Sequence, residues 1–232
     1  MRDNIYTDGS YGRQHPGWHV EDSPWKAAQI LKMLRRNDLE PASVCEAGCG
    51  AGEILSQLHE KLDDSTRFCG YEISPQAFEL ARPRRRDRLD FKLQDLLEDE
   101  PAHYDLVLAI DVVEHVEDYS SFLRVLQTKG TYKIFHIPLD LSVQTVFRGW
   151  PLLQMRGHLG HLHFFTKDLV LRTLGDLGYQ VLDHFYTPSR LELSTPTLRA
   201  KLAKFPRRAA FKLCSDLAVR VLGGYSLMVL SR

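Results

Sequence analysis

The sequence predicts an α/β fold built around a doubly wound, mostly parallel sheet. Two observations lead to this prediction. Short apolar runs typical of strands alternate with helical patterns between residues 42 and 138, and such alternation is typical of a parallel sheet covered by helices. Beyond residue 166, two strand-like runs enclose a long helical segment. This arrangement suits a hairpin-like pair at one edge of the sheet better than another strand–helix–strand unit.

The first predicted element is a helix that starts at Ser23. Ser23 suits the N-cap and Pro24 suits the first helical position. The apolar stripe of this helix consists of Ala28, Ile30, Leu31 and Leu34. Residues 1–22, which precede it, are rich in glycine, histidine and aromatic residues and show no clear period.

The remaining elements follow in order along the chain. Strands are predicted at residues 42–47, 67–73, 89–95, 104–111, 131–138, 179–186 and 225–232. Helices are predicted at residues 52–62, 75–82, 119–127, 166–178 and 198–222. The strand at 104–111 is apolar nearly throughout, as expected for a central strand that is covered on both faces.

Composition excludes several functional classes. The 30 Lys and Arg residues equal the 30 Asp and Glu residues, so no global field draws the chain to nucleic acid or to an anionic membrane. The N-terminus has no apolar signal-peptide core, and no uncharged apolar run approaches the ~20 residues of a spanning helix. The four cysteines form no CxxC pair and no zinc spacing. We therefore expect a reduced, cytoplasmic protein.

A glycine turn follows the first predicted strand, in the segment VCEAGCGAGEIL from Val44 to Leu55. A dinucleotide fingerprint needs the spacing G-x-G-x-x-G, which lets a pyrophosphate sit on the helix N-terminus. Here the third such position is Glu53, whose carboxylate would repel a pyrophosphate, and no Gly-Lys-Ser/Thr of a P-loop follows. The turn therefore favours a ligand without phosphates.

Acidic residues occur at the ends of four successive predicted strands. They are Glu46, Glu72, Asp95 and Asp111. Ligands of open α/β sheets bind at the carboxyl ends of the strands, and an acid after the second strand commonly holds ribose hydroxyls. A single acid at a strand end is usually a cap or a solvated turn residue, but four in succession predict a ligand site.

These motifs together resemble class I S-adenosylmethionine-dependent methyltransferases. VCEAGCGAG resembles their first motif, GYEIS the ribose-binding acid, LQDL the adenine-binding segment and YDLVLAIDVVEHVED the fourth motif. The resemblance covers roughly residues 42–138, with a weaker echo in HFFTKDLVLRTLGDLGYQV. It implies a Rossmann-like, seven-stranded sheet that ends in an antiparallel hairpin.

The resemblance also implies the cofactor, S-adenosylmethionine, and its product, S-adenosylhomocysteine. The cofactor contacts that it implies are Glu46, Gly48, Cys49, Gly50, Gly52, Glu72, Ile73, Asp95, Leu96 and Asp111. Glu46 and Asp111 would lie near the methionine part, Glu72 at the ribose, and Asp95 with Leu96 at the adenine. We expect one domain over residues 1–232, with an arm and helix (1–40), a cofactor-binding core (41–138) and acceptor-side elements with closing strands (139–232).

Histidines are the candidates for a general base on the acceptor side, namely His115, His136, His158, His161 and His163. We predict catalytic roles for His115 and His161. His158, His161 and His163 follow the fifth predicted strand and are flanked by glycines, so they are expected to form a mobile wall of the acceptor pocket. The alternative for His115 and His163 is a purely structural hydrogen bond.

The segment DVVEH has a second interpretation as part of a metal site. Asp111, Glu114 and His115 resemble the ExxEH cluster that binds a divalent metal in some small-RNA 2′-O-methyltransferases and ubiquinone-pathway O-methyltransferases. His161 could complete that set, although Asp111 is a shorter carboxylate than the glutamate of the pattern. EHV is also frequent in metal-free methyltransferases, so the metal is the less favoured alternative.

Three further segments have two interpretations each. The N-terminal HPGWHVEDSPWKAAQ either folds over the cofactor as a lid or packs as an arm on the sheet edge. The basic run at residues 82–88 suits a phosphate backbone but lacks interleaved aromatic residues, so a solvated helix end is favoured. FPRRAAFKL resembles an amphipathic helix start that either touches an anionic acceptor or membrane surface or is simply exposed. We also expect the apolar residues of 141–155 to line the acceptor pocket.

The leading functional hypothesis is a methyltransferase that acts on an oxygen or nitrogen of a small-molecule acceptor, with no nucleic acid favoured as a partner. One alternative is an RNA methyltransferase that uses the metal cluster. The other is an inactive cofactor-binding domain that regulates or assembles with a partner. The sequence does not choose the acceptor or the oligomeric state.

Overall fold

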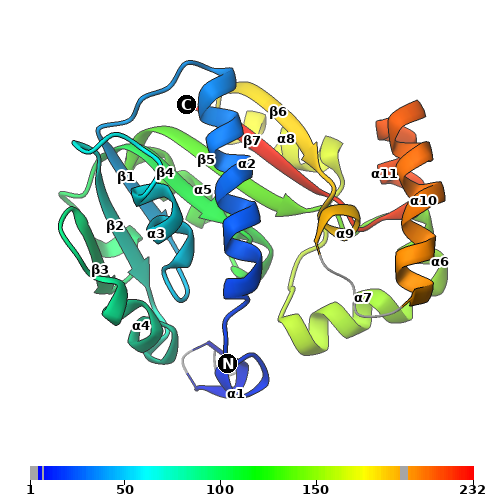
Figure 1. The fold of residues 1–232 in the computed structure, drawn as a ribbon, viewed down its shortest axis with the longest axis horizontal. Coiled ribbons are helices and arrows are strands. Elements are labelled where there is room, and N and C mark those ends of the chain that lie inside the picture. The colour runs from blue at the N-terminus through cyan, green and yellow to red at the C-terminus, as the bar shows by residue number, and fades with distance from the viewer. Residues whose placement is uncertain (1–4, 7, 194–197) are drawn as a thin grey trace.

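The computed structural model describes residues 5–6, 8–193 and 198–232, and a single seven-stranded sheet forms the centre of this part of the chain (Figure 1). The strands are β1 (Ser43–Ala47), β2 (Arg67–Glu72), β3 (Leu89–Leu93), β4 (Tyr104–Ile110), β5 (Gly130–Pro138), β6 (Val181–Thr187) and β7 (Ser226–Ser231). Their order is β3-β2-β1-β4-β5-β7-β6. The predicted α/β class and doubly wound sheet are confirmed.

The C-terminal strand reverses the direction of the sheet. The strands β1 to β5 are parallel, whereas β7 is antiparallel to both β5 and β6, with Phe135 opposite Val229. The predicted antiparallel pair at the end of the chain is therefore confirmed. Because β1 to β5 are parallel, their carboxyl ends lie along one edge of the sheet, where the site residues are found.

Helices cover both faces of the sheet. They are α1 (Ser10–Gln14), α2 (Ser23–Arg36), α3 (Glu53–His59), α4 (Pro75–Ala81), α5 (Tyr119–Thr128), α6 (Val143–Arg148), α7 (Trp150–Gln154), α8 (Lys167–Asp176), α9 (Ser189–Glu192), α10 (Leu198–Leu213) and α11 (Ser215–Leu222). Side chains of α2 and α3 form the core on one face, and side chains of α5, α8 and α11 form the core on the other. In the described part of the chain, no helix has both the length and the apolar character needed to cross a bilayer.

The central strand β4 shows why two layers of helices form. Its successive side chains alternate between the two cores, since Leu106 and Leu108 belong to the α2–α3 side and Val107 and Ala109 to the α5–α8 side. All four are at most 1% exposed. An apolar strand that is buried on both faces needs such double cover, as the sequence predicted.

Several local predictions were wrong. Helix α2 begins at Ser23 itself, with Asp22 at the N-cap and no side-chain capping bond. The helical segment predicted at 198–222 consists of two helices, because the chain leaves the helical conformation at Cys214 (φ −153°, ψ 94°). Helix α1 lies in the segment 1–22, which shows no clear period, and the helices α6 and α7 were not predicted.

Candidate active site

The glycine turn after β1 requires left-handed backbone at Gly48, Gly50 and Gly52, with φ of 67°, 55° and 76°. The three glycines differ in what lies beside them. A Cβ on Gly52 would come within 2.5 Å of the Phe91 ring, so Gly52 serves packing within the protein. A Cβ on Gly50 would meet only Trp18, at 3.9 Å. Gly50 is therefore the position in this turn where a ligand can approach the backbone most closely.

Glu72 ties the end of β2 to the glycine turn. Its carboxylate accepts hydrogen bonds from the N–H of Gly50 (2.7 Å) and the N–H of Ser74 (2.8 Å). Burial raises the pKa of Glu72, and the backbone donors oppose that rise. Because a carboxylate has about four acceptor positions, Glu72 can hold the turn and still accept bonds from ligand hydroxyls.

The other predicted cofactor residues lie along the same edge. Asp95 is the N-cap of the short helical turn Leu96–Glu98 and accepts a bond from the Leu97 N–H at 2.9 Å. Leu96 is buried and Ile73 is exposed. Cys49 is buried in the turn, and its N–H donates to the carbonyl of Tyr71. Asp95 thus has a structural task that needs no ligand.

Glu46 is buried at the end of β1. One of its carboxylate oxygens, Oε2, has no hydrogen-bond partner among the described residues. Burial raises the pKa of Glu46 well above its usual range, and the nearby Lys26 opposes this rise. A buried acceptor without a hydrogen-bond donor costs free energy. Glu46 can therefore accept a hydrogen bond from a ligand.

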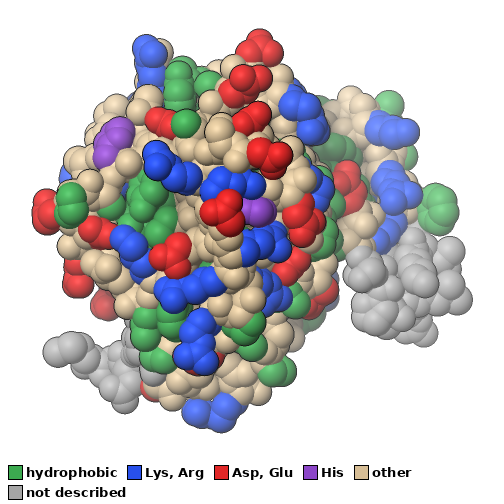
Figure 2. All heavy atoms as spheres, turned by 60° about the vertical axis from the view of Figure 1, so that its left-hand side comes forward, with side chains coloured by type: hydrophobic (Ala, Val, Ile, Leu, Met, Phe, Trp, Pro, Cys, Tyr) green, Lys and Arg blue, Asp and Glu red, His purple; other side chains and the backbone are tan. Residues whose placement is uncertain are grey.

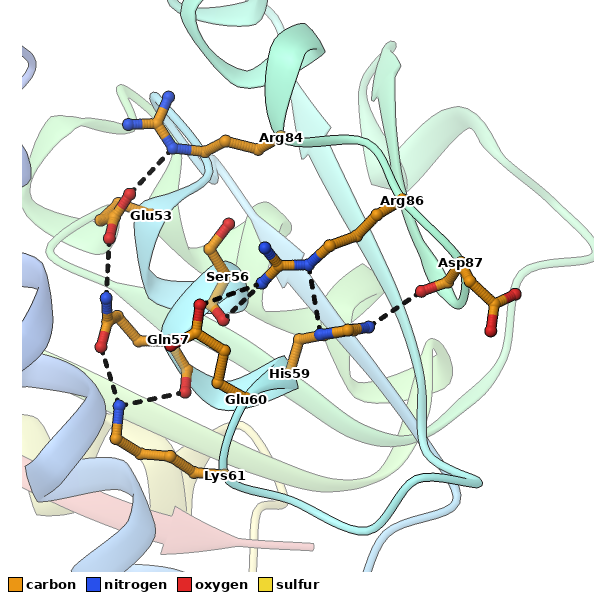
Figure 3. A network of polar contacts seen from close by, with 9 residues as sticks. All are labelled: Glu53, Ser56, Gln57, His59, Glu60, Lys61, Arg84, Arg86 and Asp87. Carbon is orange, nitrogen blue, oxygen red and sulfur yellow. Dashed lines mark hydrogen bonds and ion pairs between the residues drawn. The ribbon is translucent and has the colours of Figure 1, made fainter.

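Glu53 behaves differently from the sequence-based expectation. Its carboxylate pairs with the guanidinium of Arg84 at 2.8 Å and accepts a bond from Gln57 at 2.8 Å (Figure 3). Burial alone would raise the pKa of Glu53, but these two partners lower it. Because Arg84 compensates the charge, Glu53 opposes a phosphate less than an isolated carboxylate would.

The basic run at residues 82–88 is also paired. Arg84 and Arg86 contact carboxylates of Glu53 and Glu60, and Arg86 also donates to His59 (Figure 3). On this side of the molecule, Lys and Arg side chains are interspersed with Asp and Glu (Figure 2). The run therefore forms no uniform basic surface, which agrees with the preferred interpretation as a helix end.

Asp111 lies just beyond β4 in a left-handed conformation (φ 54°) that is uncommon outside glycine. Its two carboxylate oxygens are held by Lys26 Nζ (2.7 Å) and His136 Nδ1 (2.6 Å), and His136 Nε2 contacts the Thr187 hydroxyl (2.8 Å). Burial would raise the pKa of Asp111, but His136 and Lys26 lower it far below its ordinary value. Asp111 is thus a fixed negative charge at the ligand edge.

Glu114, His115 and His161 form a compact cluster beside Asp111. One potential ligand atom from each lies within 4.8 Å of the other two. Glu114 is fully buried, and neither of its carboxylate oxygens has a hydrogen-bond partner among the described residues. Burial and the nearby Asp111 charge raise the pKa of Glu114 well above its usual range. The structure thus brings together three of the four residues of the predicted cluster and gives Asp111 other partners.

Both histidines of the cluster are oriented by a second residue. His161 Nδ1 contacts Asp140 at 2.8 Å, so the Nδ1–H donates to the carboxylate and Nε2 keeps its lone pair. His115 Nδ1 contacts the Tyr6 hydroxyl at 2.7 Å, and His115 Nε2 lies 3.8 Å from Glu114. Burial and the neighbouring His161 lower the pKa of His115 to about 4. Nε2 of each ring is therefore suited to bind a metal ion or to accept a proton.

The other candidate histidines lie apart from this cluster, and His136 lies between Asp111 and Thr187. His163 Nε2 contacts the carbonyl of Glu117 at 3.1 Å, and the His163 ring meets Tyr119 edge-on. His158 is exposed, and its carbonyl contacts His15. His163 therefore has the structural contacts that were its alternative interpretation.

The N-terminal arm lies across the carboxyl edge of the sheet. Trp18 faces Gly50, and Gly9 and Gly12 approach Gln76 of α4. The Tyr6 hydroxyl also donates to the carbonyl of Leu159, beyond α7. The arm thus spans from the glycine turn to the histidine cluster, as a lid over both would, and α1 is seen below the sheet in Figure 1.

A shallow hollow also occurs at the opposite edge, at the amino ends of β1, β4 and β5. It is lined by Leu34, Leu39, Glu40, Pro41, Asp105, Leu106, Thr131 and Tyr132. Ligands of open α/β sheets bind beyond the carboxyl ends of the strands. We therefore place the active site at the glycine turn and the histidine cluster.

Sequence reasoning missed two residues of the site, Asp140 and Tyr6. Asp140 follows β5, so the strand-end rule that selected four acids would also have selected it. Tyr6 lies 109 residues from His115 in the chain, and no local pattern connects them.

The strand order, the reversed β7, the glycine turn and the strand-end acids define a Rossmann-like, S-adenosylmethionine-dependent methyltransferase. Residues 21–184 match the methyltransferase domain family, and the chain belongs to that family. S-adenosylmethionine is therefore its cofactor, as predicted.

Known proteins similar to this chain include enzymes that act on different acceptors. The ubiquinone biosynthesis O-methyltransferase of Xanthomonas euvesicatoria is 27% identical over 119 residues, which are 46% of this chain and 48% of the relative. The chain thus spans about half the length of the curated relatives it matches.

The magnesium protoporphyrin IX methyltransferase of Synechocystis, crystallised with S-adenosylhomocysteine, is 18% identical, with a TM-score of 0.64 over 100% of this chain and 97% of that one. An N-methyltransferase of Bradyrhizobium japonicum, also crystallised with S-adenosylhomocysteine, is 17% identical, with a TM-score of 0.63 over 99% and 98% of the two chains. The two structures share the fold with this chain.

Proposed function

We propose that the chain transfers the methyl group of S-adenosylmethionine to an oxygen of a small-molecule acceptor that carries a hydroxyl group. The sulfonium is already activated, so the protein mainly has to align the acceptor with the methyl group. A hydroxyl acceptor must also lose its proton, for which a positioned base is useful. The observation that carries the proposal is the buried Glu114–His115–His161 cluster. The names of the Xanthomonas relatives support oxygen as the acceptor atom.

The cofactor would lie along the carboxyl ends of β1 to β4. Gly48, Cys49 and Gly50 would offer backbone, with Gly52 shaping the turn from behind. Glu72 would accept the ribose hydroxyls, and Asp95, Leu96 and Ile73 would surround the adenine. Two acids, Glu46 and Asp111, would face the positively charged methionine end, where Glu46 Oε2 is unpartnered among the described residues.

His161 would act as the general base. Asp140 fixes its Nδ1–H, which leaves the Nε2 lone pair free to take the hydroxyl proton. The resulting imidazolium would be stabilised by the Asp140 carboxylate. His115 would face the same space, and Tyr6 would hold its ring in place.

A second candidate is that the same cluster binds a divalent cation. The residues fit such an ion, because two imidazoles and a carboxylate suit transition metals and Glu114 has two buried oxygens without a partner among the described residues. The Asp140–His161 contact is the orientation that ligating histidines commonly have. Glu114, His115 and His161 would hold the ion, which would acidify a coordinated hydroxyl. Asp111 is held by Lys26 and His136. The other three residues of the predicted metal set would therefore hold the ion without Asp111.

Turnover with a panel of phenols, alcohols and amines tests the proposal. We expect a phenol or alcohol to be methylated, and His161→Ala to lower kcat at least about 100-fold with little change in S-adenosylhomocysteine affinity. Asp140→Asn should lower kcat by a smaller factor, and His163→Ala is the matched control. Methylation of amines alone would contradict the oxygen assignment.

Metal dependence and the two alternative functions are distinguished in the same preparation. A cation at the cluster predicts that chelation lowers turnover and that Mn²⁺ or Zn²⁺ raises the melting temperature of the wild type but not of Glu114→Gln. Cofactor binding without turnover on any acceptor would favour the inactive regulatory domain. Salt-sensitive RNA binding with methylation of RNA would favour the RNA methyltransferase.

A further inference from the structure

Helices α6 and α7 present a stripe of apolar side chains to solvent. We define the α6–α7 stripe as Val143, Val146, Phe147, Trp150 and Leu153, which are 62%, 59%, 90%, 53% and 72% exposed. Val143, Val146 and Phe147 have the spacing of one helical face in α6, and Trp150 and Leu153 have the same spacing in α7. In a globular protein such a face normally packs on the core, and an exposed apolar patch of this kind marks an interaction site.

Polar contacts order the start of α6 and join this helix to α10. Ser142 and Thr145 form a capping box at the start of α6. Arg207 of α10 donates to the side chain of Gln144 at 2.6 Å and to the carbonyl of Gly223 at 2.8 Å. The Arg207–Gln144 contact joins α6 to α10, and the side chains of the apolar stripe remain exposed. Figure 1 shows α6, α10 and α11 together on the side away from β3.

This side of the molecule carries an excess of positive charge. Residues 141–166 contain Arg148 and Arg156 and no carboxylate side chain, whereas Lys167 pairs with Asp216. Residues 204–215 contain Lys204, Arg207, Arg208 and Lys212 and again no carboxylate side chain. The rest of the chain must therefore be acidic, since Lys and Arg equal Asp and Glu overall. Arg208 and Lys212 of α10 are exposed beside two exposed apolar residues, Phe205 and Leu213.

The stripe is continuous with the acceptor side of the active site. The π-helical turn Met155–Leu159 follows α7 directly and ends next to His161. The Leu159 carbonyl accepts from Tyr6, and the His161 N–H contacts the Met155 carbonyl at 3.4 Å. A surface that bound the stripe would therefore lie next to the histidine cluster.

We propose that the α6–α7 stripe inserts into the interface of an anionic lipid bilayer, with the basic residues of α10 on the lipid headgroups. Apolar side chains flanked by Lys and Arg are the pattern of a helix that lies on a membrane, and anionic headgroups attract such basic residues. Arg148, whose guanidinium lies over the Trp150 ring at 4.8 Å, would reach the phosphates while Trp150 stays in the interface. A second copy of the chain on this face would bring two basic surfaces together, which is unfavourable.

Co-sedimentation with vesicles tests this proposal without using turnover. The probes are vesicles of phosphatidylcholine alone and of phosphatidylcholine with phosphatidylglycerol in equal parts. The wild type should bind the second kind only, and binding should fall as salt is raised. Phe147→Asp with Leu153→Asp should weaken binding about tenfold or more, and Arg148→Glu with Arg156→Glu should also weaken it.

Matched controls separate this result from unfolding. Leu169→Asp removes a half-exposed apolar residue of α8 and should leave vesicle binding unchanged. All variants should keep the S-adenosylhomocysteine affinity of the wild type. Trp150 fluorescence should shift to the blue when anionic vesicles are added, and Trp150→Phe should lose most of that shift.

Three results would overturn the proposal. The first is equal vesicle binding by the wild type and Phe147→Asp with Leu153→Asp. The second is self-association of the wild type in the absence of vesicles, abolished by the same two substitutions, with no vesicle binding. The third is binding of RNA through this face with no affinity for anionic vesicles. None of these results bears on whether the chain methylates a hydroxyl.

Discussion

The cofactor side and the acceptor side of the ligand edge differ in which groups form them, since the first uses mainly backbone and the second mainly side chains. Around the glycine turn, backbone N–H groups and positive φ angles shape the site, and Glu72 locks the turn through Gly50. Around the histidine cluster, side chains from distant segments meet, with Tyr6 and His161 on either side of His115. A cofactor side formed by backbone groups therefore has a local sequence motif. An acceptor side formed by side chains from distant segments has no such motif.

The largest expected effect tests the backbone side. Gly50→Val should lower S-adenosylhomocysteine affinity about 100-fold or more, because a β-branched residue is strained at φ 55° and its methyl groups would fill the space next to Trp18. Isothermal titration calorimetry measures the affinity, and circular dichroism checks the fold.

Gly175→Val is the matched control for Gly50→Val. Gly175 has no positive φ, and nothing lies within 4 Å of the Cβ that it would gain. This variant should bind S-adenosylhomocysteine like the wild type. Unchanged affinity in Gly50→Val would mean that the turn is not where the cofactor approaches.

The same difference explains what the sequence could predict. The alternation of strands and helices predicted the sheet, and the glycines predicted the turn, because both follow from chain geometry. The cofactor was implied by the resemblance of the glycine and acid motifs to a known family. The apolar residues of 141–155 were expected to line the acceptor pocket, and in the structure Phe147 and Leu153 are exposed on two separate helices. The sequence does not tell what covers such residues. The repulsion of a pyrophosphate by Glu53 was overestimated. The partner that compensates its charge, Arg84, lies 31 residues away in the chain.

Substitution of Glu114 tests whether the histidine cluster lowers the stability of the fold. Replacing Glu114 by Met should raise the free energy of unfolding by about 1–3 kcal/mol, since a buried carboxylate with no partner among the described residues is removed. Thermal unfolding in the presence of a chelator would show this as a rise of several degrees in Tm, at about 2–4 °C per kcal/mol.

Two further measurements make the Glu114→Met result decisive. The variant should also lose turnover, and the exposed Glu100→Met should change neither property. If Glu114→Met destabilised the metal-free protein instead, the carboxylate would have a stabilising partner, and the argument for an orphaned ligand at this cluster would fail.

The smallest effect concerns Tyr6, which joins the two halves. Its hydroxyl lies 3.1 Å from the Leu159 carbonyl and 2.7 Å from Nδ1 of His115, and we expect this contact to select one tautomer of His115. Tyr6→Phe should therefore cost about 0.5–1.5 kcal/mol of stability and lower kcat several-fold while S-adenosylhomocysteine affinity changes little. Nitrogen-15 spectra of His115 should show a mixture of tautomers in the variant. Tyr132→Phe, in the hollow at the opposite edge, is the control, and a single unchanged tautomer in Tyr6→Phe would show that the arm packs on His115 without setting its chemistry.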